Sequence, residues 1–177
     1  MPSGKTHDTI TLLLAPPTFA VAWGVTGSLA LAAAATCAML FGGLMFGPDL
    51  DIQSRQYTRW GVFRFLWFPY KVMFRHRSRW SHGIIFGTLI RVVYFAAVLS
   101  LVATAGVYLR ALFIAGGVAP GWPEMLDAWR AIESNVLAYS IDKNMILSVL
   151  AGLWWGAASH TLTDVAWSVL RKGSEIF

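Results

Sequence analysis

The chain has 177 residues, of which 56% are hydrophobic and only 13% charged, and its mean hydropathy is +0.57. Soluble domains are typically about 45–50% apolar and about 25% charged, so this chain has too few polar side chains to cover a water-facing surface. Its single cysteine, Cys37, excludes a disulfide framework or a cysteine-based zinc site within one chain. The net charge of +5 would suit nucleic acid, but the basic residues alternate with aromatic ones in one loop, which argues against a nucleic-acid partner.

Apolar segments predict an all-α integral membrane bundle that forms one domain, residues 1–177. Four such segments cover about residues 10–25, 28–47, 83–108 and 145–170. A helix needs about 20 mostly apolar residues to cross the hydrocarbon layer. The third segment continues toward the 110s and is interrupted by Arg91 and Arg110.

The first two segments form one uncharged stretch, in which Gly27 and Ser28 belong to the expected turn. Pro16 and Pro17 would kink the first helix. In the competing interpretation, a single long helix begins at Pro17. Gly42, Gly43 and the alanine run at 32–35 predict close helix packing.

Two loops complete the chain, a basic loop at residues 48–82 and a second loop at residues 110–144. Within the second loop, residues 124–137 predict a short amphipathic helix at the membrane surface. The basic loop contains seven Lys and Arg residues, namely Arg55, Arg59, Arg64, Lys71, Arg75, Arg77 and Arg79.

Orientation follows from these basic residues, because Lys and Arg accumulate in cytoplasmic loops. Four spans place both termini and the basic loop on one side, so we expect a bacterial inner or thylakoid membrane protein with cytoplasmic N- and C-termini. The basic loop would contact anionic membrane lipids. In a sharper interpretation, Arg75, Arg77 or Arg79 holds a phosphate group of a substrate, since arginine makes bidentate contacts to phosphate.

Histidines and aspartates from distant segments converge at one depth under this topology. They are His7 and Asp8 before the first span, Asp49 and Asp51 after the second, His76 and His82 before the third, and His160 and Asp164 in the fourth. His160 and Asp164 are four residues apart and share a helix face. Ionisable groups inside a span are costly, which makes them candidates for function.

Imidazole and carboxylate groups are the ligands expected for zinc, manganese or iron. An extended Asp49-Leu50-Asp51 segment would direct both carboxylates to the same side, and one of them would bridge two ions. Two metals about 3.5–4 Å apart form the usual clamp for phosphoester hydrolysis. The structural alternative is that the aspartates cap helices and that Ser81 caps the third span beside an interfacial His82.

The same motifs resemble a known family. The opening Met-Pro-Ser-Gly-Lys-Thr-His-Asp is followed by Pro48-Asp49-Leu50-Asp51, His76-Arg77-Ser78, Ser81-His82-Gly83 and Ser159-His160-Thr161-Leu162-Thr163-Asp164. This order is similar to that of metal-binding membrane proteins common in cyanobacteria and of the wider YdjM-like membrane-bound metal-dependent hydrolases. The resemblance implies one set of metal ligand candidates: His7, Asp49, Asp51, His76, His82, His160 and Asp164.

The resulting hypothesis is a metal-dependent hydrolase that acts on a phosphoester or lipid-like substrate at the cytoplasmic membrane face. Asp51 and His82 are the expected catalytic residues. The alternative is a non-catalytic accessory or assembly subunit of a larger membrane complex, with membrane-protein partners or a second copy of the chain. Its histidines would then bind structural metal or pigment. Transport ranks third, because four short helices are few for a carrier.

Overall fold

The computed structural model describes residues 2–76, 78–138 and 142–174. Within these ranges the regular secondary structure is entirely helical, which confirms the all-α prediction. The chain forms two compact units, residues 1–92 with 143–177 and residues 93–142. Four helical stretches are long and apolar enough to cross a membrane, at Gly4–Thr26, Leu29–Asp51, Phe86–Ile114 and Lys143–Arg171. They correspond to α1 (Gly4–Thr26), to α2 (Leu29–Leu44) with the residues that follow it, to α6 (Phe86–Ile114) and to α8 (Lys143–Ser174).

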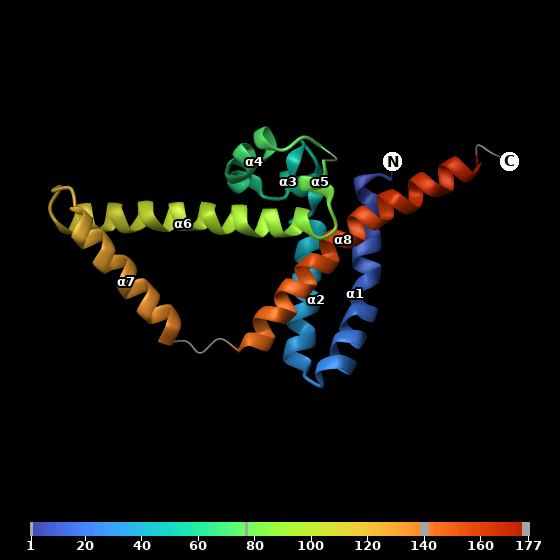
Figure 1. The fold of residues 1–177 in the computed structure, drawn as a ribbon, viewed down its shortest axis with the longest axis horizontal. Coiled ribbons are helices and arrows are strands. Elements are labelled where there is room, and N and C mark those ends of the chain that lie inside the picture. Colours follow the sequence, from blue (N-terminus) through green and yellow to red (C-terminus); the bar gives the residue numbers. More distant parts are fainter. Residues whose placement is uncertain (1, 77, 139–141, 175–177) are drawn as a thin grey trace. The chain divides into compact units, whose positions relative to one another are not determined.

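Helices α1 and α2 form an antiparallel hairpin (Figure 1). Ser3 caps α1 by accepting a hydrogen bond from the Thr6 N–H, and Ser28 caps α2 in the same way. Gly27 ends α1 in the left-handed conformation, with φ of 64°, which a glycine adopts without strain. Pro16 and Pro17 lie inside α1, so the alternative helix beginning at Pro17 is wrong.

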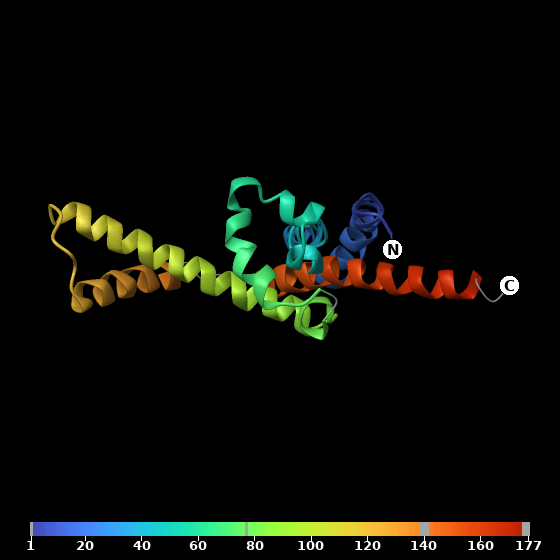
Figure 2. The same ribbon diagram turned by 90° about the horizontal axis from the view of Figure 1, so that it is seen from above.

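Helix α8 lies against α2, and Figure 2 shows both hairpin helices end-on beside it. Glycines at the crossing allow the two backbones to meet. A Cβ atom on Gly152 or Gly156 would collide with the carbonyl oxygens of Ala35 and Met39, and one on Gly42 would meet the Leu153 backbone. The predicted role of the small residues in close packing is therefore confirmed.

The segment between α2 and α6 folds into short helices. They are η1 (Pro48–Asp51), α3 (Arg55–Thr58), η2 (Gly61–Trp67), α4 (Phe68–Met73) and α5 (Arg79–His82). Buried aromatic rings hold them together, with Trp67 packed edge-on against Phe46, Trp60 and Tyr70. This expected loop is thus a small helical cap with its own aromatic core.

The second unit contains the rest of α6 and the helix α7 (Trp122–Ala138). The α6 helix ends at a turn in which Gly116 and Gly117 have φ of 64° and 94°. Helix α7 covers the segment expected to form an amphipathic helix, and its Asp127 and Arg130 form an exposed ion pair.

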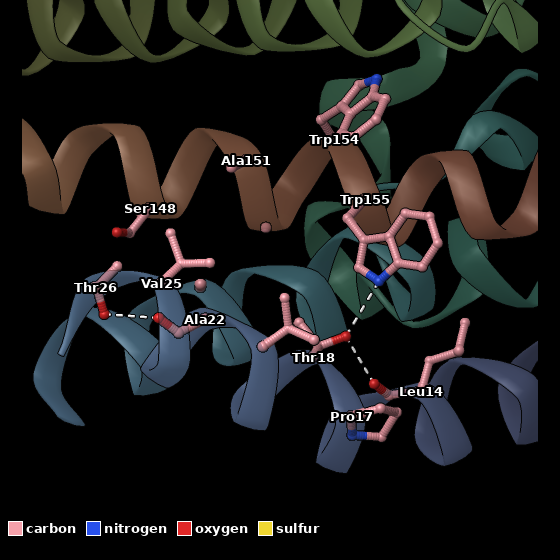
Figure 3. Close-up of a pocket in the computed structure, with 13 residues that line it drawn as sticks. Leu14, Pro17, Thr18, Ala22, Val25, Thr26, Ser148, Ala151, Trp154 and Trp155 are labelled. Carbon is pink, nitrogen blue, oxygen red and sulfur yellow. Dashed lines mark hydrogen bonds between the residues drawn. The ribbon is translucent and has the colours of Figure 1, made fainter. Parts of the chain in front are cut away.

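An apolar groove of about 530 Å³ runs between α1 and α8 (Figure 3). Leu14, Pro17, Val25, Ala151 and Trp155 are among the side chains that line it. At one wall, the indole N–H of Trp155 donates a hydrogen bond of 3.1 Å to the Thr18 hydroxyl. The Thr18 hydroxyl donates in turn to the Leu14 carbonyl, so these polar groups are satisfied inside an apolar surface.

Candidate metal centre

The short helix η1 presents the Asp49 and Asp51 carboxylates directly after α2. Pro48 begins it, and it is a 3₁₀-helix, so the expectation of an extended Asp-x-Asp segment is wrong. With three residues per turn, side chains two positions apart point in different directions. Asp49 has ion-pair contacts with His82 and His160, whereas Asp51 has them with His76 and His82. The two carboxylates therefore share His82, and only Asp49 reaches His160.

One group of three candidate ligands joins α1 to α8. His7 Nε2 lies 3.4 Å from Asp164 Oδ1, and His160 Nε2 lies 3.9 Å from Asp164 Oδ2. The imidazole rings of His7 and His160 stack with centroids 3.7 Å apart. The ligand atoms lie within 4.8 Å of one another, close enough to share one ion.

A second group consists of Asp49, His76 and His82, and it meets the same distance limit of 4.8 Å. It joins η1 to α5 and to the segment before α5. The rings of His76 and His82 meet edge-on with centroids 4.8 Å apart. Each group thus combines two imidazoles with one carboxylate, a donor set that suits zinc, manganese or iron.

Asp49 connects the two groups. Its Oδ1 lies 3.4 Å from His82 Nε2 in one group, and its Oδ2 lies 3.4 Å from His160 Nε2 in the other. A carboxylate with one oxygen toward each group has the arrangement of a bridging ligand in a two-metal site.

Asp51 has a different position from Asp49. Its side chain is completely buried, and its Oδ1 accepts a hydrogen bond of 2.8 Å from His76 Nδ1. Its Oδ2 lies 3.7 Å from His82 Nδ1, which also lies 3.0 Å from the Ser81 hydroxyl. A carboxylate on the Nδ1 side of a histidine fixes the ring and leaves Nε2 for a metal. Asp51 is therefore placed to orient both histidines.

Gln56 is a contact residue that the sequence interpretation missed. Its buried amide accepts a hydrogen bond from the Asp49 backbone N–H and donates one to the Gly43 carbonyl. The same amide nitrogen lies 3.3 Å from His160 Nδ1. Gln56 therefore ties η1, α2 and α8 together at the site. A glutamine in a basic loop gave no sequence signal of this role.

Asp8, the residue that follows His7, forms an ion pair with arginine. Arg59 donates to both Asp8 carboxylate oxygens, at 2.8 and 2.6 Å, and to the Leu44 carbonyl at 2.7 Å. This bidentate pair joins α1 to the short helix α3. Of the two adjacent residues, His7 is the one that lies in a candidate ligand group.

Arg91 is a buried cation next to the site, with only 1% of its surface exposed. It donates hydrogen bonds to the Ser81 carbonyl at 2.7 Å and to the Thr88 hydroxyl at 3.2 Å. Its guanidinium also interacts electrostatically with Asp51. Burial raises the pKa of the neighbouring Tyr70 phenol, an effect that Arg91 opposes. The arginine that interrupts the third apolar segment therefore supports the site.

The residues present fit a bound cation. Among the described residues, several buried polar atoms at the site lack a hydrogen-bond partner: His7 Nδ1, Asp51 Oδ2, His82 Nε2, His160 Nε2 and Asp164 Oδ1. Unsatisfied buried polar groups are costly, and ligation by a metal would remove much of that cost.

A polar cavity of about 260 Å³ opens onto the centre. His7, Asp49 and His160 line it, together with Arg55 and Gln56. Of the arginines expected to hold a phosphate, Arg75 and Arg79 are exposed and are not among the residues that line this cavity. Arg77 lies outside the described residues.

Comparison with known proteins supports metal binding. The family model described as "Uncharacterized metal-binding protein (DUF2227)" matches residues 2–173, which include all the candidate ligands. An "Uncharacterized protein" of Aquifex aeolicus (strain VF5) is 41% identical over 56 residues, 31% of this chain and 39% of that relative. The chain therefore matches well under half of the relative's length. No solved structure matches it.

Proposed function

Because the chain belongs to the metal-binding family described as DUF2227, we propose that its histidines and aspartates hold two divalent cations for hydrolysis of a phosphoester. The observation that carries this proposal is Asp49, whose two carboxylate oxygens each lie 3.4 Å from a histidine of a different group. His7, His160 and Asp164 would hold one ion, and His76 and His82 the other. Zinc, manganese and iron all suit this donor set.

Bound ions would polarise the ester and lower the pKa of a water nucleophile toward 7. The chain itself supplies orientation. Asp51 fixes His76 by accepting a hydrogen bond from the Nδ1 of that histidine. Gln56 holds Asp49 and His160 in place. Asp51 and His82 remain our predictions for catalytic residues. The contacts of Asp51 favour a role in which it acts through His76 and His82.

The apolar groove favours a substrate with a hydrocarbon chain. Leu14 lies seven residues after His7 on α1, so both project from nearly the same face of the helix. The groove, which Leu14 lines, therefore continues the face of α1 that carries His7. A lipid-like phosphoester would place its phosphate at the centre and its chain in the groove. This arrangement suits catalysis at the cytoplasmic face of a membrane.

Exposed aromatic side chains support the non-catalytic alternative. Phe63, Phe65, Phe68 and Trp80 have between 59% and 64% of their surface exposed on the helical cap. Exposed aromatics are typical of protein–protein contacts and of membrane interfaces. In this alternative the metal centre is structural and the cap docks onto a partner subunit.

An assay of purified protein separates the two functions. Detergent-solubilised protein is loaded with zinc, manganese or iron and tested for phosphate release from phosphoesters with and without hydrocarbon chains. We expect release that a chelator abolishes and that readdition of the metal restores. Metal-loaded protein that releases no phosphate from either type of substrate would favour the accessory subunit.

A further inference from the structure

Arginine side chains near the centre have two different environments. Arg59 has a structural role, because it donates hydrogen bonds to both Asp8 carboxylate oxygens and to the Leu44 backbone carbonyl. Arg55 contributes Nη1 to an ion pair of 2.8 Å with Asp8 Oδ2, and half of its side chain is exposed. Asp8 already receives two hydrogen bonds from Arg59. Arg55 is therefore not required to neutralise Asp8.

The stem of Arg55 lies across the first turn of α1. A Cβ atom on Gly4 would come within 2.9 Å of Arg55 Cδ, so the glycine leaves the space that the arginine occupies. The N-terminus of a helix carries a partial positive charge and favours anions. Arg55 adds a full positive charge at the same place.

Arg55 also faces the candidate metal ligands. It lines the polar cavity of about 260 Å³ together with His7, Asp49 and His160, which come from both ligand groups. His7 and His160 are at least nine-tenths buried, and each has a ring nitrogen without a hydrogen-bond partner among the described residues. The cavity therefore combines a guanidinium donor with candidate metal ligands in one small space.

We propose that Arg55 is the substrate-binding residue that holds the phosphate oxygens of the phosphoester in this cavity. The inference rests on the proposed function and names its anion subsite. Guanidinium groups bind phosphate through two parallel hydrogen bonds, and Arg55 has donors beyond its contact with Asp8. Arg55 is thus a further candidate beside Arg75, Arg77 and Arg79.

The test measures binding of inorganic phosphate to zinc-loaded full-length protein by isothermal titration calorimetry, with zinc content determined on the same samples. Arg55→Ala should keep its zinc and bind phosphate at least about tenfold more weakly, as expected for loss of a charged hydrogen bond. Arg55→Lys should fall between wild type and Arg55→Ala, because lysine keeps the charge without the bidentate geometry. Arg64→Ala, an exposed arginine outside the cavity, is the matched control and should bind like wild type.

Each other outcome has a distinct meaning. Zinc-loaded Arg55→Ala that binds phosphate as tightly as wild type would overturn the inference, as would a zinc-loaded wild type that binds no phosphate. Loss of zinc from Arg55→Ala would also contradict it, because the arginine would then hold the ligand groups together. A wild-type protein that binds no divalent metal would instead overturn the proposed function.

Discussion

At the scale of single residues, the site consists of candidate metal ligands and of side chains that contact them. Asp49 and Asp51 are two positions apart in a 3₁₀ turn, and both contact His82, but only Asp49 also contacts His160. Residue type and spacing predicted which side chains gather at the centre. They did not distinguish the bridging role that we propose for Asp49 from the orienting role that we propose for Asp51, because that difference depends on the local backbone conformation.

Gln56 provides the residue-scale prediction. Replacing it with alanine removes the contacts that hold the Asp49 backbone and the His160 ring. Orienting contacts of this kind are typically worth about 10–100-fold in metal affinity, so Gln56→Ala should bind zinc more weakly by that factor. Competition with a fluorescent chelator measures the affinity. Thr58→Ala, an exposed neighbour on the same segment that does not line the cavity, serves as the control, and equal affinities in both variants would refute the orienting role.

At the scale of secondary-structure elements, hydrophobic length predicted the four long helices and their order. Capping residues such as Ser3 and Ser28 mark where two of them begin. The helical cap was missed because its short helices follow from tertiary contacts. Trp67 is buried among other aromatic rings, and Arg59 donates a hydrogen bond to Asp8, 51 residues earlier in the chain. Sequence periodicity carries no signal for contacts at that separation.

The crossing of α2 and α8 gives the first prediction about elements. A leucine at Gly156 has no room against the Met39 carbonyl and would push α8 away from α2. Overpacking of this kind costs about 1–3 kcal/mol, so Gly156→Leu should unfold at a lower temperature in detergent. Gly106→Leu, in α6, meets no atom within 4 Å and should unfold like wild type. Equal unfolding temperatures for both variants would contradict the packing account.

The groove between α1 and α8 gives the second prediction about elements. Val21 lines it, and a tryptophan there would occupy space that a hydrocarbon chain needs. For Val21→Trp we expect kcat/KM to fall for long-chain phosphoesters and to stay unchanged for short-chain ones, because the metal ligands are untouched. Steady-state kinetics with a homologous series of chain lengths provides the measurement. A uniform loss across the series would argue against a chain in the groove.

At the scale of the whole molecule, four helices are apolar enough to span a membrane, and their order predicts the topology. The basic loop and both termini should face the cytoplasm, with the 110–144 loop outside. Arg64→Cys and Asp127→Cys, each in a Cys37→Ala background, place a single cysteine on the basic loop and on the 110–144 loop. Labelling with a membrane-impermeant maleimide then reports on which side of the membrane each loop lies. In intact bacterial cells only Asp127→Cys should react, whereas Arg64→Cys should react after permeabilisation. The opposite pattern would reverse the orientation.

A two-metal centre bridged by Asp49 makes a definite prediction about the metal content of the purified protein. Mass spectrometry of detergent-purified protein should find about two divalent ions per chain in the wild type. A His160→Ala, Asp164→Ala double variant removes two of the three ligands from one group and should lose at least half of that metal. Ser168→Ala, on the same helix and exposed, is the control. Equal, trace metal in wild type and double variant would show that these residues do not form a metal centre.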